Sequence, residues 1–114
     1  MGELHGIARF RFHKGKVEEF KRLSERAMEV VRAKDTGTLR YDVYLNEDET
    51  EAIVCERYTD SQALFDHAEH LGDELMAAVL ATGDVHGELL GEPSDELRAK
   101  LGGPVQLFTP FLSL

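Results

Sequence analysis

Imidazole, phenol and carboxyl side chains give this sequence its capacity for acid–base chemistry. His67 could act as a general base, because imidazole titrates near neutral pH with little tuning. Tyr41 or Tyr58 could donate a hydrogen bond to the oxyanion that forms when a substrate loses a proton. The donor depends on which strand face is turned toward a site, and a slip of one residue would exchange Tyr41 for Arg40.

These residues also have structural interpretations. His67 could serve only to hydrogen-bond a helix to the sheet. With His70 it forms a His-x-x-His pair that could share a metal ion, but no carboxylate or cysteine is placed in the sequence to complete the site, so no metal is expected. Glu56 lies among apolar neighbours, and a structural ion pair with Arg40 or Arg9 is the expected partner for a buried carboxylate.

The composition indicates a small globular domain that binds neither nucleic acid nor membranes. The 114 residues suit one domain, and 42% apolar with 31% charged residues argues against disorder. A net charge of −9 opposes binding to nucleic-acid phosphates and anionic lipids. No apolar run reaches the roughly 20 residues that span a bilayer, and the N-terminal segment does not resemble a signal peptide, so a cytoplasmic location is expected.

Hydrophobic periodicity predicts alternating strands and helices. Strands are expected at residues 3–12, 38–45, 52–58, 83–90 and 105–112, where apolar positions alternate or β-branched and aromatic residues gather. A helix is expected over residues 17–34, with Gly37 ending it in a left-handed conformation. A second helix should start at the capping box Thr59-x-x-Gln62, and near Gly72 it should either bend or give way to a separate helix.

The order strand, helix, strand, strand, helix, strand is the split βαβ pattern of an α+β domain. It predicts an antiparallel sheet with the helices on one face. We expect a single domain over residues 1–114, with its core at 3–90 and a short helix and strand at 92–114 as an extension. A second copy of the chain is the simplest cover for the open sheet face, and the last strand could be the arm that reaches it.

Short motifs follow one another in a specific order along the chain. A Gly15-Lys16 turn precedes the first helix, Gly37-x-Leu39-Arg40-Tyr41 enters the second strand, Glu56-Arg57-Tyr58-Thr59-Asp60 leaves the third, and Ala63-x-x-x-His67 lies in the next helix. Together they resemble the antibiotic biosynthesis monooxygenase family over roughly residues 4–90. The resemblance implies a homodimer of ferredoxin-like subunits, a dimeric α+β barrel, with a pocket in each subunit between helices and sheet.

The resemblance also implies where a site would lie. The family's helix histidine falls on His67. The residues expected to line the pocket are Leu64, His67, Leu71 and Leu75 from the helix and Ala8, Tyr41, Glu56 and Tyr58 from the strands. The heme-degrading branch has an asparagine in place of Ala8 and a tryptophan in place of His67, and this chain has no tryptophan, which argues against heme as its substrate.

Three functions remain open from the sequence. Known enzymes of the family oxidise phenolic or quinol-like aromatics with O₂, often without metal or flavin. The resemblance therefore implies a cofactor-independent monooxygenase acting on a small aromatic substrate, with His67 as the base and Tyr41 as the oxyanion donor. An isomerase or dehydratase on the same scaffold would use the same base and consume no O₂. A non-catalytic binding module would use His67 only to orient its ligand.

Overall fold

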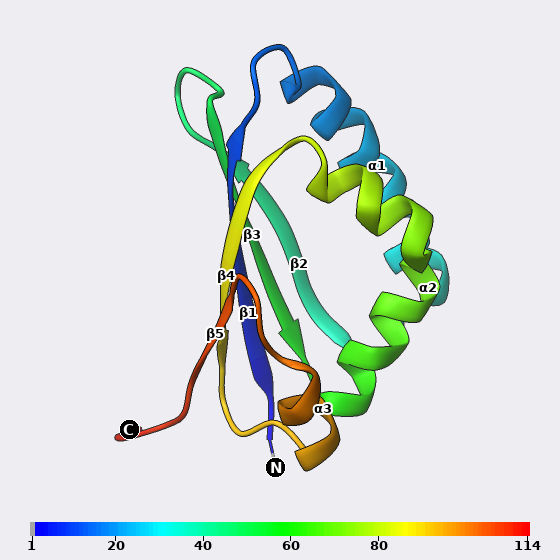
Figure 1. Cartoon of the computed structure of the whole chain (residues 1–114). Coiled ribbons are helices and arrows are strands. Elements are labelled where there is room, and N and C mark those ends of the chain that lie inside the picture. Colours follow the sequence, from blue (N-terminus) through cyan, green and yellow to red (C-terminus); the bar gives the residue numbers. More distant parts are fainter. Residues whose placement is uncertain (1) are drawn as a thin grey trace.

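A twisted sheet with two long helices on one face makes up most of the molecule in the computed structural model, which describes residues 2–114 (Figure 1). The strands are β1 (Leu4–Phe12), β2 (Thr38–Leu45), β3 (Glu51–Tyr58), β4 (Gly83–Leu90) and β5 (Val105–Phe108). The helices are α1 (Val17–Lys34), α2 (Ser61–Leu80) and α3 (Asp95–Lys100). Within this range no helix is long and apolar enough to cross a membrane.

The sheet has the strand order β2-β3-β1-β4-β5. The first four strands pair antiparallel, as the split βαβ pattern predicts, and confirm the α+β ferredoxin-like architecture. β5 pairs parallel to β4, so the complete sheet is mixed rather than purely antiparallel. The last strand also ends at Phe108, short of the predicted residue 112, because the following segment makes no ladder.

Alternation along the strands sends one set of side chains toward the helices. Phe10, Ala52 and Val54 from the sheet form a buried cluster with Phe20 of α1. Phe20 is only 1% exposed, and burying a side chain of this size stabilises the fold by roughly 2 kcal/mol. The apolar stripe of α1 thus holds that helix against one end of the sheet.

Helix α2 is bent in the middle. Gly72 has φ 82° and ψ 158°, a conformation that glycine adopts at little cost, and the predicted kink is therefore confirmed. The bend allows both halves of the helix to curve over the sheet (Figure 1). The predicted capping box is wrong by one residue, because the side chain of Asp60 accepts the Ala63 backbone N–H at 2.8 Å and serves as the N-cap.

The turn between α1 and β2 differs from the sequence-based expectation. Gly37 does not take a left-handed conformation; α1 ends at Lys34, and its C-cap residue Asp35 has an extended backbone. Glycine is required at position 37 for a different reason, since a Cβ there would lie 2.5 Å from the Ala63 side chain. The close approach packs the α1–β2 turn against the start of α2 and brings Asp35 under that helix.

The segment after β4 returns to the body of the domain. The Ser94 side chain caps α3 by accepting the Leu97 backbone N–H at 3.2 Å. Leu97 is 4% exposed and packs in a cluster with Leu4 and Leu89. Beyond β5 the chain leaves the sheet (Figure 1), and the side chains of Phe111, Leu112 and Leu114 are exposed.

Candidate functional site

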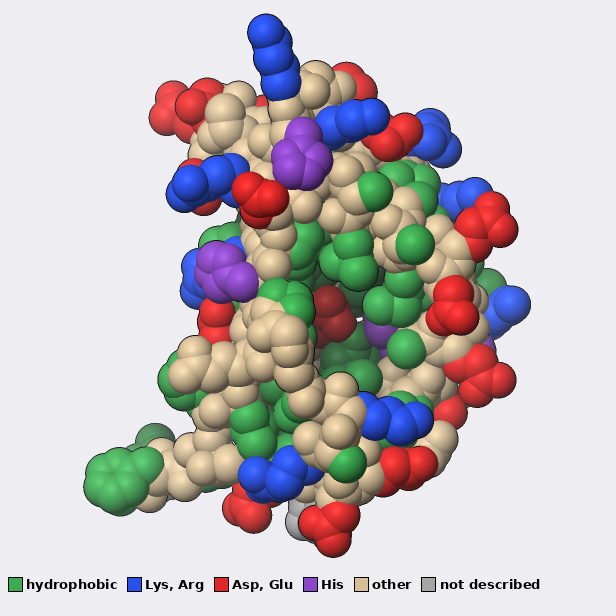
Figure 2. All heavy atoms as spheres, viewed as in Figure 1, with side chains coloured by type: hydrophobic (Ala, Val, Ile, Leu, Met, Phe, Trp, Pro, Cys, Tyr) green, Lys and Arg blue, Asp and Glu red, His purple; other side chains and the backbone are tan. Residues whose placement is uncertain are grey.

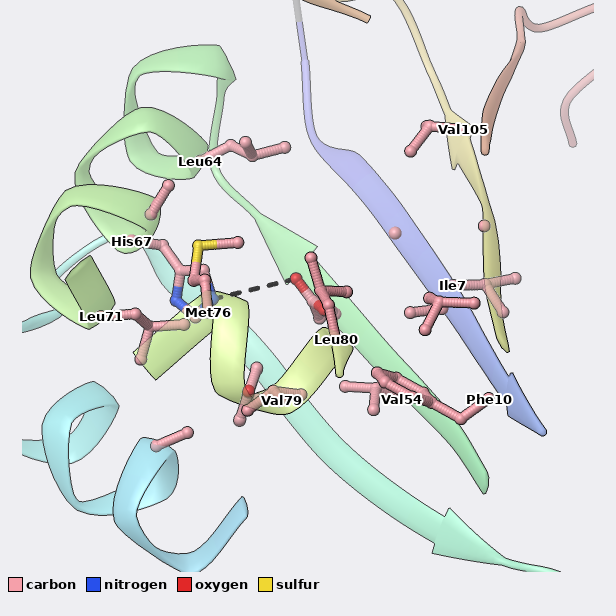
Figure 3. A pocket seen from close by; sticks show the side chains of 18 of the residues that line it. Ile7, Phe10, Val54, Leu64, His67, Leu71, Met76, Val79, Leu80 and Val105 are labelled. Carbon is pink, nitrogen blue, oxygen red and sulfur yellow. Dashed lines mark ion pairs between the residues drawn. The ribbon is translucent and has the colours of Figure 1, made fainter. Parts of the chain in front are cut away.

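A cavity of about 300 Å³ lies between the sheet and the two long helices. Figure 2 shows this hollow walled mostly by hydrophobic side chains, with acidic and histidine side chains visible inside it. The eight residues that the sequence suggested for a pocket all line it: Ala8, Tyr41, Glu56, Tyr58, Leu64, His67, Leu71 and Leu75. Both halves of the bent α2 contribute, with Leu64 and Leu71 before or at the bend and Met76 and Val79 after it (Figure 3).

His67 is the most enclosed imidazole that faces the cavity. Only 6% of the residue is exposed, and its Nδ1 atom lies 2.7 Å from Oδ2 of Asp35. An ionised carboxylate can only accept, so Nδ1 carries a proton, and in the neutral imidazole the lone pair is on Nε2. Nε2 lies 4.0 Å from Oε1 of Glu56 on β3, the contact dashed in Figure 3. The free nitrogen therefore points into the space where a ligand would bind.

Asp35 is held by several donors. The Thr38 hydroxyl donates to Oδ2 at 2.6 Å, and Nδ1 of His70 lies 2.6 Å from Oδ1. Burial by itself would raise the pKa of Asp35, but the hydrogen bonds from Thr38, His70 and His67 outweigh it and hold that pKa below its usual value. Asp35 is thus an ionised group at neutral pH, and it fixes both the orientation and the tautomer of His67.

Glu56 and Tyr58 form a second polar pair on β3. The Tyr58 hydroxyl donates to Oε1 of Glu56. Burial raises the pKa of Glu56, although this hydrogen bond and His67 act in the opposite direction. The expected ion pair of Glu56 with Arg40 or Arg9 is wrong, because those arginines lie on the other sheet face.

The two arginines have partners of their own on that open face. Arg40 pairs with Asp42 at 2.7 Å, and Arg9 pairs with Glu88 at 3.3 Å. The alternative in which Arg40 replaces Tyr41 as the oxyanion donor is excluded by the same geometry, since the observed register pairs Tyr41 with Glu56 on the helix-facing side.

Tyr41 completes the polar part of the cavity. Its ring centroid is 5.2 Å from that of His67, and the Tyr58 ring is 5.4 Å from His67 on β3. Burial, followed by the charges of Glu56 and Asp35, raises the pKa of Tyr41 well above that of a free phenol. Tyr58 is shifted in the same direction, by burial first and then by Glu56. Both phenols are therefore hydrogen-bond donors, not bases, at neutral pH.

We call Tyr41, Glu56, Tyr58 and His67 the polar wall of the cavity. It places a base with a fixed tautomer, a carboxyl group that is easily protonated and two phenolic donors around one space. The remaining walls are apolar, which strengthens electrostatic interactions inside the cavity. This arrangement suits proton removal from a ligand hydroxyl and stabilisation of the resulting oxyanion.

A metal site at the two histidines was judged from the sequence to lack a carboxylate. The structure shows that Asp35 lies against both histidines, so that reasoning was wrong. The two Nδ1 atoms meet separate oxygens of Asp35 at 2.7 and 2.6 Å, however, which is hydrogen-bond geometry. Across residues 2–114 no group of three or more His, Cys, Asp or Glu side chains is arranged to hold a metal ion.

Sequence reasoning missed Asp35 and two residues of the extension. The spacing of His67 and His70 was the only signal for Asp35, because it places two imidazoles side by side where one carboxylate can accept from both. Leu101 and Val105 also line the cavity, although the sequence suggested no pocket role for residues 92–114. No local pattern could reveal this, since it depends on how α3 and β5 fold back.

Comparison with known proteins agrees with this architecture. A family model described as antibiotic biosynthesis monooxygenase matches residues 4–79. No curated protein sequence matches the chain. MupZ from Pseudomonas fluorescens is 22% identical with a TM-score of 0.78, over 100% of this chain and 94% of that chain. Rv0793 from Mycobacterium tuberculosis is 28% identical with a TM-score of 0.67, over 82% and 96%.

SnoaB from Streptomyces nogalater, described as a cofactor-independent oxygenase, also shares the fold. It is 19% identical with a TM-score of 0.64, over 78% of this chain and 91% of that chain. At this identity the likeness is one of architecture. The family model, in contrast, covers β1 to α2, the segment that carries all of the polar wall. The chain belongs to the antibiotic biosynthesis monooxygenase family.

Proposed function

We propose that this protein is a cofactor-independent monooxygenase that oxidises a quinol-like or polyphenolic aromatic with O₂. The observation that carries the proposal is the Asp35–His67 pair, which presents a free Nε2 to an apolar cavity beside the Tyr41 phenol. Cofactor-free oxygenation requires such a base, because a phenolate transfers an electron to O₂ far more readily than a neutral phenol. The family and the description of SnoaB as a cofactor-independent oxygenase support the same reaction class.

The reaction starts with proton transfer from the substrate hydroxyl to Nε2 of His67. The ring anion then gives one electron to O₂, and the two radicals combine to form a carbon–oxygen bond. The new bond forms at a ring carbon that carries one hydrogen. The peroxide takes back the proton from His67, and water then leaves with that ring hydrogen, so that a carbonyl forms at the same carbon. One oxygen atom stays on the product and the other leaves as water, and the substrate supplies all the electrons.

The side chains of the cavity have separate tasks in this scheme. Tyr41 donates to the oxyanion, which its raised pKa allows because the phenol keeps its proton. His67 is stabilised as imidazolium by Asp35. The apolar residues, among them Leu64, Leu71 and Leu75, exclude water and contact the aromatic rings of the substrate.

The protein works as a homodimer in this proposal. The sheet face opposite the helices carries half-buried Ile53 and Cys55 among charged residues, and no helix lies over it in Figure 1. The tail with Phe111 and Leu112 would reach the second copy as an arm, since a small domain gains from such burial. Light scattering on the full chain, beside a chain ending at Phe108, tests this; a monomeric full chain would contradict it.

An isomerase or dehydratase is the second candidate, and Glu56 favours it. A carboxyl group with a raised pKa lies 4.0 Å from the base Nε2 of His67, so one group could donate a proton while the other accepts one. That pair would move protons on a ligand without O₂. The aromatic substrate class would be unchanged.

Oxygen consumption distinguishes these functions. The chelator-treated protein is mixed with hydroquinones, naphthoquinols or anthrones, and O₂ uptake is recorded beside His67→Ala. Saturable uptake that collapses in the variant supports the oxygenase. Ligand-dependent deuterium exchange from heavy water, with no uptake above the autoxidation blank, would instead favour the isomerase. Binding without uptake or exchange would leave a binding module, in which His67→Ala weakens affinity only.

A further inference from the structure

We propose that Asp35 and His70 form a positioning pair that sets the tautomer and the basicity of His67. The inference rests on the proposed function, in which His67 is the base. His70 does not line the cavity, and neither it nor Asp35 is placed to touch a bound ligand. Their effect must therefore pass through the shared carboxylate.

Each carboxylate oxygen of Asp35 is hydrogen-bonded to a different imidazole. Oδ2 accepts hydrogen bonds from Nδ1 of His67 at 2.7 Å and from the Thr38 hydroxyl, and Oδ1 accepts one from Nδ1 of His70 at 2.6 Å. The Asp35 side chain is only 3% exposed, so water does not compete for these contacts. Because an ionised carboxylate is an acceptor only, both imidazoles carry their proton on Nδ1.

The two imidazoles differ in their access to solvent. The His67 side chain is 7% exposed and that of His70 is 31% exposed. His70 is therefore in contact with solvent, while His67 faces the cavity. One carboxylate joins a solvent-facing and a cavity-facing imidazole, and the charge on either is felt by the other through Asp35.

The two imidazoles share one negative charge, so protonation of one makes protonation of the other less favourable. When His70 is protonated, part of the attraction of Asp35 for a second cation is lost, and protonation of His67 becomes less favourable. The other titratable groups around His67 are Tyr41 from β2 and Glu56 and Tyr58 from β3. His70 thus lowers the basicity of His67 as the pH falls, which a purely structural tie between α1 and α2 would not do.

Nitrogen NMR of the histidine side chains tests the pair without any substrate. Long-range proton–nitrogen spectra of the full chain report the tautomer and the titration midpoint of His67. In the wild type we expect the Nδ1–H form of neutral His67. In Asp35→Asn the amide donates to Nδ1 instead, and His67 should switch to the Nε2–H form.

The second arm replaces His70. His70→Gln keeps a donor to Asp35 but removes the titratable neighbour, so the midpoint of His67 should move upward by about half a pH unit. His86→Gln is the matched control, because His86 is exposed on β4 and does not line the cavity; it should leave His67 unchanged. An unchanged His67 midpoint in His70→Gln, or a retained Nδ1–H form in folded Asp35→Asn, would overturn the inference.

The His70 arm decides the outcome even if Asp35→Asn fails to fold, because Gln at a partly exposed position leaves the buried carboxylate satisfied. The test is also separate from that of the proposed function. If the spectra behave as expected but no quinol supports O₂ uptake, the pair is real and only the reaction has been misassigned. If uptake is found and the spectra do not change, the positioning pair is wrong and the oxygenase stands.

Discussion

The polar wall of the cavity and its C-terminal wall are built in different ways. The polar wall comes from β2, β3 and α2, within residues 4–79 that match the family. The C-terminal wall consists of Leu64, Leu89, Leu101 and Val105, and the last three lie beyond residue 79, where the family match ends. The first wall holds the hydrogen-bonded groups and the second is apolar. We infer that the polar wall determines which reaction is possible, and that the C-terminal wall determines which ligand shapes fit.

Replacing His67, the proposed base in the polar wall, should have the largest effect on the rate. His67→Gln keeps the size of the side chain and a donor to Asp35 but has no basic nitrogen. We expect the rate of O₂ uptake to fall by about 10²–10⁴-fold, the usual contribution of general base catalysis. Ligand affinity should change little, because the apolar walls remain. His86→Gln is the control, and an equal loss of rate there would break the comparison.

Removal of the oxyanion donor should have the next largest effect. Tyr41→Phe deletes one hydroxyl from the polar wall and keeps the ring against His67. A single donor of this kind contributes about a hundredfold in rate, and most of it should appear in kcat rather than KM. Steady-state O₂ uptake measures both constants. A change confined to KM would assign Tyr41 to binding instead.

A change in the C-terminal wall should alter ligand size rather than rate. Val105→Trp fills space beside Leu101, and we expect the affinity for a polycyclic ligand to fall about tenfold, roughly 1.4 kcal/mol. A single-ring quinol should retain its kcat. Titration calorimetry with both ligands gives the comparison, and Val105→Ala should act in the opposite direction. Equal losses for both ligands would mean that this wall does not select by shape.

The smallest effect concerns stability and tests the environment of Glu56. Since its pKa is raised, Glu56 supports the fold fully below the pKa of an unfolded glutamate, about 4.3, and this support is lost as pH rises through the folded value. Glu56→Gln should therefore be more stable than wild type at neutral pH, on the order of 1 kcal/mol, and equal to it in acid.

Denaturant unfolding at several pH values measures this difference. Glu51→Gln on the same strand is the control, because Glu51 is exposed and should show no such pH dependence. A wild type that gains stability over Glu56→Gln as pH rises would show that Glu56 is held as a charged partner of His67 instead.

Local patterns predicted the elements but not all of their partners. β2 and β4 occupy the predicted residues 38–45 and 83–90, because alternation is a property of neighbouring residues. The sequence indicated only that a helix ends near Asp35. Its contacts with His67 and His70 could not be predicted, because they join parts of the chain that are remote in sequence. The parallel pairing of β5 has the same origin. Long-range contacts, not periodicity, decide both.

In the proposed function, the polar wall removes a proton from an aromatic hydroxyl. The absorption spectrum of bound para-nitrophenol tests it directly, because the phenolate and the phenol absorb differently. An apolar cavity alone would favour the neutral phenol. We expect the wild-type protein to bind the phenolate at a pH below the pKa of the free probe, and His67→Gln to bind the neutral phenol. Neutral probe in both proteins, at saturating binding, would contradict it.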